Sequence, residues 1–253
     1  MPTYAIGDIH GNLAALEDLL EQLLPEIKPG DILVFLGDYI DRGLDSQGCV
    51  ERILRLKTEA DFSVVALLGN HEQWMLRTLD DPKQHSWLVG MEALETIRSY
   101  SEDAANILTD HMAELGIRLF TEKLPLPYEA FFDSVPLEHI EFFCELKTYY
   151  QTPDVICVHA GLSLDGILDP HHDNLHVWGP LGFPEDYEGA NPVVYGHRNN
   201  GVVDSDGRIR PCIGPNRTYG IDTIAHGVLT AMRFPDEKVW QSGRKLVSLN
   251  SPE

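Results

Sequence analysis

Residues 1–80 alternate between short apolar runs and longer segments in which apolar residues recur at helical spacing. A short apolar run bounded by turn signals is typical of a buried strand, whereas the longer spacing is typical of an amphipathic helix. Because the runs are apolar on both faces, they favour an α/β fold with a covered sheet. The pattern predicts strands at Tyr4–Ile6, Ile32–Leu36 and Val64–Leu68, with helices over residues 13–24 and 46–56.

Residues 80–152 lose this alternation and carry helical patterns such as Trp87, Leu94 and Ile97. We therefore predict one domain over residues 1–253, with a helical insertion at about 80–152 that overhangs the edge of the sheet. Strands resume afterwards, and the turn at residues 225–227 is interpreted as a hairpin. The later strands are predicted at Val155–Val158, Val193–Tyr195, Tyr219–Thr223, Val228–Arg233 and Lys238–Gln241.

A polar cluster follows each of the main predicted strands. Since strand ends in an α/β sheet meet at one edge, we expect the clusters to come together. Their mixture of carboxylates, imidazoles and one amide suits borderline divalent metals. The set is too large for one catalytic ion and fits two ions that share a carboxylate, clamp a phosphate and activate a water. The predicted ligands are Asp8, His10, Asp38, Asn70, His159 and His197.

The clusters lie in motifs that resemble a known family. GDIHG at residues 7–11, GDYIDRG at 37–43 and GNHE at 69–72 resemble the signature motifs of the phosphoprotein phosphatases, in a compact bacterial-type form. These enzymes are calcineurin-like metallophosphoesterases. The resemblance implies a four-layer α/β/β/α sandwich of two mixed β-sheets flanked by helices. It also implies two divalent ions, manganese first, with iron, zinc, cobalt or nickel as alternatives.

The resemblance assigns roles to the metal ligands. Asp38 matches the carboxylate that bridges the two ions. Asp8, His10 and His197 match ligands of the first ion. Asn70 and His159 match the remaining ligands of the second ion.

Three further residues match the catalytic machinery. His71 matches the general acid that protonates the leaving alkoxide, and Asp41 matches the carboxylate that orients it. Arg42 matches a phosphate-gripping arginine, whose forked guanidinium suits the equatorial oxygens of a phosphoryl transition state. Asn70 is also placed at the phosphate. Glu72 is interpreted as holding its loop through backbone N–H groups rather than binding a metal.

The chain departs from the family at its second phosphate-binding arginine. Trp178 occupies the expected neighbourhood, but no arginine accompanies it. We predict that Arg198 replaces it, since this residue directly follows His197. His176 is expected to be a solvated loop residue rather than a phosphate contact. The alternatives to Arg198 are Arg208, Arg210 and Arg217; His85, His111, His139 and His226 are interpreted as structural or exposed, and His171 and His172 receive no role.

Composition narrows the possible partners. The 40 acidic and 19 basic residues give a formal charge of -21, which disfavours a nucleic-acid polymer. The N-terminus has no secretory pattern and no apolar run is long enough to span a membrane, so we expect a cytoplasmic protein without a membrane partner. The four cysteines are interpreted as buried, reduced thiols. Nothing in the sequence indicates the oligomeric state.

These observations predict a metal-dependent phosphatase in which a metal-bridging hydroxide attacks a phosphomonoester. The substrate would be a phosphorylated protein or peptide, carrying phosphoserine, phosphothreonine or phosphotyrosine, or a small phosphoester. One alternative is a hydrolase of diadenosine tetraphosphate or other dinucleoside polyphosphates. Another is a non-catalytic scaffold that kept the fold, although the complete motifs at Asp41, Arg42 and His71 argue against it.

Overall fold

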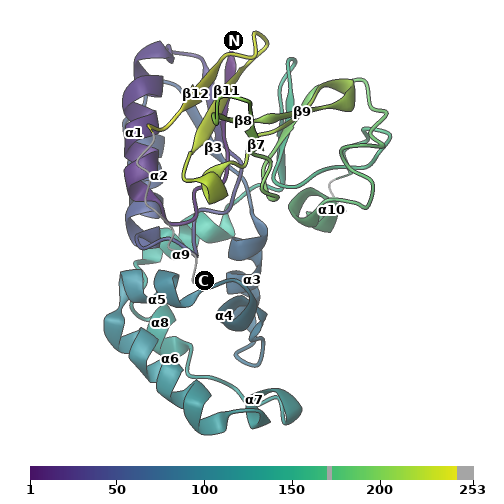
Figure 1. Cartoon of the computed structure of the whole chain (residues 1–253). Coiled ribbons are helices and arrows are strands. Elements are labelled where there is room, and N and C mark those ends of the chain that lie inside the picture. The colour runs from purple at the N-terminus through teal and green to yellow at the C-terminus, as the bar shows by residue number, and fades with distance from the viewer. Residues whose placement is uncertain (170–172, 244–253) are drawn as a thin grey trace.

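The computed structural model describes residues 1–169 and 173–243. Two mixed sheets of five strands each form its upper part, with helices α1 and α2 along one side (Figure 1). The first sheet has the order β12-β11-β1-β2-β3, in which β1, β2 and β3 are parallel. Its strands are β1 (Thr3–Ile6), β2 (Ile32–Phe35), β3 (Ser63–Ala66), β11 (Thr230–Phe234) and β12 (Val239–Gln241).

The second sheet has the order β4-β5-β6-β10-β9, with β5, β6 and β10 parallel. A small ribbon of two strands, β7 (Val202–Val203) and β8 (Ile209–Arg210), lies beside it. The strands of the second sheet are β4 (Tyr149–Gln151), β5 (Ile156–Val158), β6 (Val193–Tyr195), β9 (Cys212–Gly214) and β10 (Thr218–Gly220). The predicted fold class of two mixed sheets flanked by helices is therefore confirmed.

Side chains that alternate along the central strands point into two different hydrophobic cores, one on each face of the first sheet. Tyr4 and Ile6 of β1 pack into the core beneath the helices, whereas Ala5 of the same strand packs into a second core between the sheets. Both faces of β1 are thus buried, as its uniformly apolar pattern predicts. Helix α1 (Leu13–Leu23) contributes its apolar face to the first core, and α2 (Ser46–Glu59) packs beside it. The outer face of the second sheet carries a third core.

The predicted hairpin at residues 225–227 is wrong. Strands β10 and β11 flank this turn but belong to different sheets, where β10 pairs with β6 and β11 pairs with β1. The turn contains a short 3-10 helix, η3 (Ile224–His226), and Gly227 in the left-handed region at φ 73°. A glycine turn between two apolar runs resembles a hairpin locally, but long-range pairing decides the partner of each strand.

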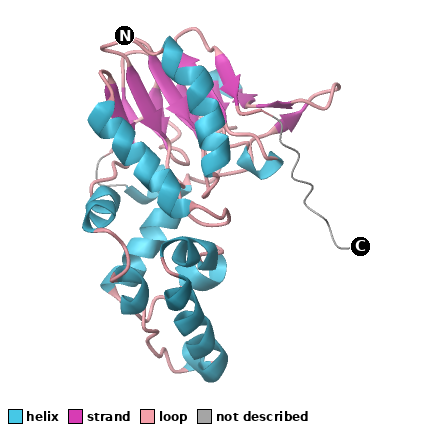
Figure 2. Ribbon diagram, turned by 90° about the vertical axis from the view of Figure 1, so that its left-hand side faces the viewer, coloured by secondary structure: helices cyan, strands magenta, loops and turns pink. Residues whose placement is uncertain are grey.

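The segment after β3 is helical and lies below the sheets (Figures 1 and 2). It begins with α3 (Asn70–Asp80), so the third motif itself opens the helical region. The predicted helical insertion at about 80–152 is wrong at its C-terminal end. There, β4 is an edge strand of the second sheet. The other helices are α4 (Ser86–Gly90), α5 (Leu94–Tyr100), α6 (Glu102–Leu115), α7 (Arg118–Thr121), α8 (Glu129–Phe132) and α9 (Leu137–Cys144), followed later by α10 (Asp173–Trp178).

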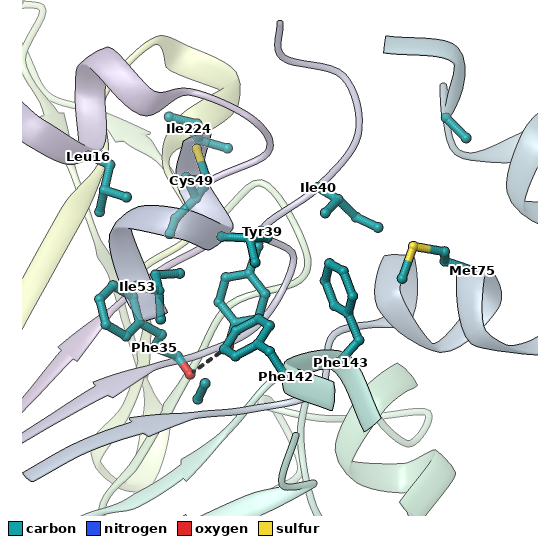
Figure 3. Close-up of a cluster of buried hydrophobic side chains, with 14 of the residues drawn as sticks. Leu16, Phe35, Tyr39, Ile40, Cys49, Ile53, Met75, Phe142, Phe143 and Ile224 are labelled. Atoms are coloured by element: carbon teal, nitrogen blue, oxygen red, sulfur yellow. Dashed lines mark hydrogen bonds between the residues drawn. The ribbon is translucent and has the colours of Figure 1, made fainter. Parts of the chain in front are cut away.

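The loop after β2 is anchored in the main core. Tyr39 and Ile40 are buried among side chains of α2 and α9, including Phe142 and Phe143 (Figure 3). The Tyr39 hydroxyl donates to the carbonyl of Leu67 at 2.6 Å. Two apolar anchors thus hold the loop that presents the neighbouring polar residues. Within residues 1–169 and 173–243, no helix has the length and apolar character of a membrane span.

Candidate metal centre

The predicted ligands converge at the carboxyl ends of β1, β2, β5 and β6 and at the start of α3. Asp38 lies at the centre, with its Oδ2 atom 3.6 Å from His10 Nε2 and 3.4 Å from His159 Nε2. Asp8 Oδ2 lies 4.0 Å from His10 Nε2. All the predicted ligands are buried except His197, which is partly exposed. The strand-end rule therefore predicts where these side chains meet.

Three predicted ligands at the metal centre have positive φ angles. His10, Asp38 and His197 have φ values of 47°, 53° and 70°, in the left-handed region that side chains disfavour. Such residues cost on the order of 1–3 kcal/mol each and gather at functional sites. Gly69 is required for a different reason, because a Cβ there would overlap Asp38. The polar groups therefore come together through strained backbone at three residues and through a glycine where a side chain would not fit.

Hydrogen bonds fix the orientation of two imidazoles. His10 Nδ1 lies 3.0 Å from the carbonyl oxygen of Ile40, and His159 Nδ1 lies 2.9 Å from that of Leu36. A carbonyl accepts, so each ring donates from Nδ1 and, when neutral, has its lone pair on Nε2. This arrangement is the usual one for a metal-binding histidine, in which an outer partner sets the tautomer.

The remaining lone pairs face one another. Asn70 Oδ1 lies 2.9 Å from His159 Nε2 and 2.7 Å from His197 Nδ1. Acceptors this close repel unless a cation or a proton lies between them. Two groups of three side chains have ligand atoms within 4.8 Å of one another, and Asp38 belongs to both. The donor set therefore fits two divalent ions with Asp38 as the shared carboxylate; its groups are His10, Asp38 and His71, and Asp38, His159 and His197.

The grouping of ligand atoms differs from the predicted division in more than one respect, since His71 lies with His10 and Asp38, and Asp8 belongs to neither group. His197 was expected with Asp8 and His10, yet its ring faces Asn70 and lies 5.1 Å from the ring of His159. The cause is the backbone turn at His197, whose N–H donates to Asp8 Oδ2 at 2.9 Å. The main chain contacts the first group of ligands while the imidazole points to the second.

The histidines of the centre differ in the direction of their pKa shifts. Burial lowers the pKa of His10 to about 3, and burial together with the nearby His159 lowers the pKa of His197 to about 4. Burial acts in the same direction on His159, but the charge of Asp38 outweighs it and raises the pKa of that ring. The pKa of Asp8 is raised by burial and then by the charges of Asp222 and Asp38. Asp8 and His159 therefore keep a proton to a higher pH than ordinary groups of their kind, whereas His10 and His197 lose theirs at a lower pH.

The predicted catalytic pair is in contact. His71 Nδ1 lies 2.7 Å from Asp41 Oδ2, and both side chains are buried. Burial lowers the pKa of His71, but the charge of Asp38 and the Asp41 hydrogen bond outweigh it and raise the pKa. Asp41 is held in turn by the helical segment, because Trp87 Nε1 donates to Oδ2 at 2.9 Å and Thr96 Oγ1 donates to Oδ1 at 2.6 Å.

Glu72 has the structural role predicted for it. Its carboxylate accepts from the backbone N–H groups of Asp38 at 3.0 Å and Tyr39 at 2.8 Å. It also accepts from Ile40 and Gly69. The third motif thereby fixes the loop of the second motif.

Arg42 points into the centre. Its guanidinium lies 2.9 Å from His10 Nε2 and 3.3 Å from His71 Nε2. Arg198 is exposed beside His197, and its charge contributes to the low pKa of that ring. By contrast, Arg210 pairs with Asp204 at 2.7 Å and Arg217 donates to the carbonyl of Ala190. Of the proposed substitutes for the missing arginine, Arg198 is therefore the one next to a ligand.

The remaining histidines lie outside the centre. The prediction that His176 is solvated is wrong, because it is buried in α10 and its ring lies 5.1 Å from that of Tyr149. Its carbonyl also accepts from the Ala160 N–H at 2.7 Å, and the local sequence did not indicate these contacts. His85 and His139 are structural, in line with the prediction, since both are buried and bonded to tyrosine hydroxyls. His111 and His226 are exposed as expected, while His171 and His172 lie outside the described residues.

The cysteines only partly match expectation. All are free; Cys49 and Cys157 are buried, but Cys212 is half-buried and Cys144 is exposed. Cys144 is the last residue of α9 and is exposed, so the prediction that it is buried is wrong.

Sequence reasoning missed three polar residues around the centre. Trp87 and Thr96 lie in the helical segment, and nothing in their spacing indicated that they hold Asp41. Asp222 is buried beside Asp8 and lies after a strand, as the other clusters do. Burial and the charge of Asp38 raise its pKa to about 6. Its position after β10 was the one available signal.

Comparisons with known proteins identify the family of the chain. Residues 1–227 match the family model described as calcineurin-like phosphoesterase. The chain is 28% identical over 264 residues to the asymmetrical bis(5'-nucleosyl)-tetraphosphatase PrpE of Oceanobacillus iheyensis, covering 92% of this chain and 88% of the relative. It is 37% identical over 87 residues to serine/threonine-protein phosphatase 2 of Escherichia coli, covering 34% and 36%.

Solved structures show the same fold. A putative diadenosine tetraphosphatase superimposes with a TM-score of 0.58 at 19% identity, covering 95% of this chain and 92% of the other. A cold-active protein-tyrosine phosphatase of a psychrophilic Shewanella superimposes with a TM-score of 0.55 at 16% identity, covering 96% and 80%. Because the family model matches residues 1–227 of the 253 in the chain, the chain belongs to the calcineurin-like phosphoesterases, a family of hydrolases that depend on a binuclear metal centre.

Proposed function

We propose that the protein is a metal-dependent phosphatase that hydrolyses phosphomonoesters, with phosphoserine, phosphothreonine or phosphotyrosine of proteins as its substrates. The observation that carries this proposal is the grouping of Asp41, His71 and Arg42 beside Asp38. A metal centre alone can polarise a phosphate, but release of an alkoxide also requires a proton donor.

His71 is suited to that role. Asp41 accepts from Nδ1, so in the protonated ring Nε2 carries the second, transferable proton and faces Asp38 at 3.9 Å. The raised pKa keeps the ring protonated to a higher pH than an ordinary histidine. Arg42 lies against Nε2 and offers a fork of donors for phosphate oxygens at the same place. The proton and the phosphate grip therefore come from neighbouring side chains.

Two divalent ions, manganese in our proposal, would be held by Asp8, His10, Asp38, Asn70, His159 and His197. When bound, they supply charge for the phosphate oxygens and a more acidic water. Asn70 and Arg198 complete the proposed phosphate contacts. The protein's own part is to orient the phosphate with Arg42 and deliver a proton from His71.

A second candidate is a hydrolase of dinucleoside polyphosphates. The similarity to a tetraphosphatase over 92% of the chain supports it. A local feature supports it too, since the Trp74 and Trp178 rings lie 5.2 Å apart and Trp178 lies 5.9 Å from the ring of His197. Both indoles are partly exposed. Aromatic rings at the edge of a phosphate site can stack on a nucleobase, worth roughly 1–3 kcal/mol per base.

The enzyme proposal is tested with manganese-loaded protein and p-nitrophenyl phosphate. Hydrolysis that EDTA abolishes supports it, and no turnover with any divalent metal rejects it in favour of a scaffold. A side-by-side assay on phosphopeptides and diadenosine tetraphosphate separates the two substrate classes. Trp74→Ala should reduce kcat/KM for the dinucleotide but not for a phosphoserine peptide, with the exposed Leu79→Ala on the same helix as the control.

A further inference from the structure

Asp222 is a buried carboxylate at the metal centre that the reaction proposed above does not use. It follows β10 and is only 3% exposed. Its loop touches the first motif, because a Cβ on Gly7 would lie 2.6 Å from the carbonyl oxygen of Ile221. The absence of a side chain at Gly7 thus lets the backbone before Asp222 lie against the backbone before Asp8.

The loop of Asp222 is also tied to the loop of His197. The Asp222 carbonyl accepts from the Asn200 N–H at 2.7 Å. The side chain of Asn200 donates to the carbonyl of Gly196 at 2.9 Å. Asp222 therefore has a fixed place between the segments that carry the first and last predicted ligands.

One carboxylate oxygen of Asp222 is unsatisfied. The side chain accepts from the Ile224 N–H, but Oδ1 is buried and has no hydrogen-bond partner within the part of the chain that the structure describes. Leaving a buried polar atom unpaired costs about 1–3 kcal/mol, and more for a charged group. A fold retains such an atom when something else satisfies it.

The charges around Asp222 indicate that a cation satisfies its unpaired oxygen. Asp222 repels Asp8, and Asp38 repels Asp222, so three acidic groups share one buried region. Arg42 is a cation acting on both Asp8 and Asp222. Divalent ions held by the predicted ligands would add the missing positive charge at this place.

We propose that Asp222 is a positioning residue of the metal centre, which strengthens divalent-metal binding from outside the set of direct ligands. Its free oxygen is available as an acceptor, and its charge adds to that of Asp8 and Asp38 in attracting the ions. The competing explanation is purely structural: Asp222 only caps η3 through the Ile224 N–H. The two explanations differ in what happens to the metal-free protein.

Asp222→Asn separates them, because asparagine keeps the shape and an oxygen for Ile224 while it removes the charge. Manganese is titrated into metal-free protein by calorimetry, and Tm is measured without metal. We expect manganese affinity to fall about 10-fold to about 100-fold, as for other outer partners of metal ligands. The metal-free Tm should not fall, since one of three repelling groups is gone.

Asp31→Asn is the matched control. Asp31 is also buried and accepts from the Lys28 N–H at 3.0 Å, but it lies before β2, at the opposite end from Asp38. This variant should bind manganese like the wild type. Unchanged affinity in Asp222→Asn, or an equal loss in Asp31→Asn, would overturn the proposal.

If Asp222→Asn does not fold, Asp222→Ser serves in its place, because it is smaller and also uncharged. The same loss of affinity supports the proposal and unchanged affinity rejects it. The inference uses the metal ligands of the proposed function but not its substrate. Wild-type protein that binds manganese without hydrolysing any phosphoester would reject the proposed function, while the Asp222 comparison would still be decisive.

Discussion

The indole N–H of Trp87 donates to Asp41 Oδ2 at 2.9 Å, and the same oxygen lies 2.7 Å from His71 Nδ1. A residue of the helical segment therefore holds the carboxylate that orients the proposed general acid. Thr96 binds the other oxygen of Asp41 and the Asp41 N–H, which leaves the carboxylate little freedom. The helical segment is thus part of the site's framework as well as a cover for the sheets.

Trp87→Phe should slow hydrolysis by roughly 10-fold to about 100-fold, the equivalent of a hydrogen bond to a charged group of about 1.5–3 kcal/mol. The ring volume is largely kept, so the core around Phe131 should remain packed. The measurement is kcat for a phosphoserine peptide, whose alkoxide leaving group needs the proton, with manganese content determined in parallel. Trp240→Phe, at the edge of the first sheet, is the control. A rate equal to that of the wild type would show that Asp41 does not need this contact.

His71→Asn should lower kcat by about 10²-fold to about 10⁴-fold, as expected for loss of a general acid. The two ions should remain bound, because the six predicted ligands are untouched, although His71 lies within reach of one ion position. A substrate with a better leaving group should lose less activity, since it needs the proton less. The comparison of p-nitrophenyl phosphate with a phosphoserine peptide measures this difference. An equal loss on both substrates would argue against proton donation by His71.

The sequence predicted the central strands well because their signal is local. Residues 3–6, 32–35 and 63–66 are apolar on both faces and end in polar turns, so composition and position agree. Pairing could not be read in the same way. The turn at residues 225–227 has hairpin chemistry, yet β10 and β11 enter different sheets because their partners are far away in the chain.

The same contrast applies to the site. Asp8, Asp38 and Asn70 could be found because each follows a predicted strand within a short motif. Trp87 and Asp222 could not, since their contacts with the motifs join distant segments. The orientation of His197 also depended on a left-handed backbone angle that sequence did not reveal.

Asp38→Asn should disturb both metal positions, because Asp38 belongs to both groups of ligand atoms. An amide removes the charge that holds two cations together. We expect manganese bound per protein to fall below that of the wild type and activity to be lost. Asn70→Ala is the comparison, since Asn70 lies only with His159 and His197 and should affect one position. Full loading of Asp38→Asn with two ions would reject the bridging role.

Manganese binding should tighten as pH rises, because metal must displace protons from some of its ligands. Asp8 has a raised pKa from burial and the charges of Asp222 and Asp38, and His159 has a raised pKa because Asp38 outweighs burial. Both hold a proton in the metal-free protein at a pH where isolated groups would have lost it. His10 and His197, with pKa values lowered to about 3 and about 4, are already neutral and release none.

The raised pKa values of Asp8 and His159 determine how manganese affinity changes with pH. Below the raised pKa values, metal competes with protons and affinity falls; above them, no proton is displaced and affinity becomes constant. Calorimetric titrations in buffers of different ionisation enthalpy give the number of protons released at each pH. Asp8→Asn should release fewer protons than the wild type and should bind manganese with a weaker dependence on pH. Affinity that does not change with pH in the wild type would mean that Asp8 and His159 are already deprotonated, contrary to the environment in which the fold places them.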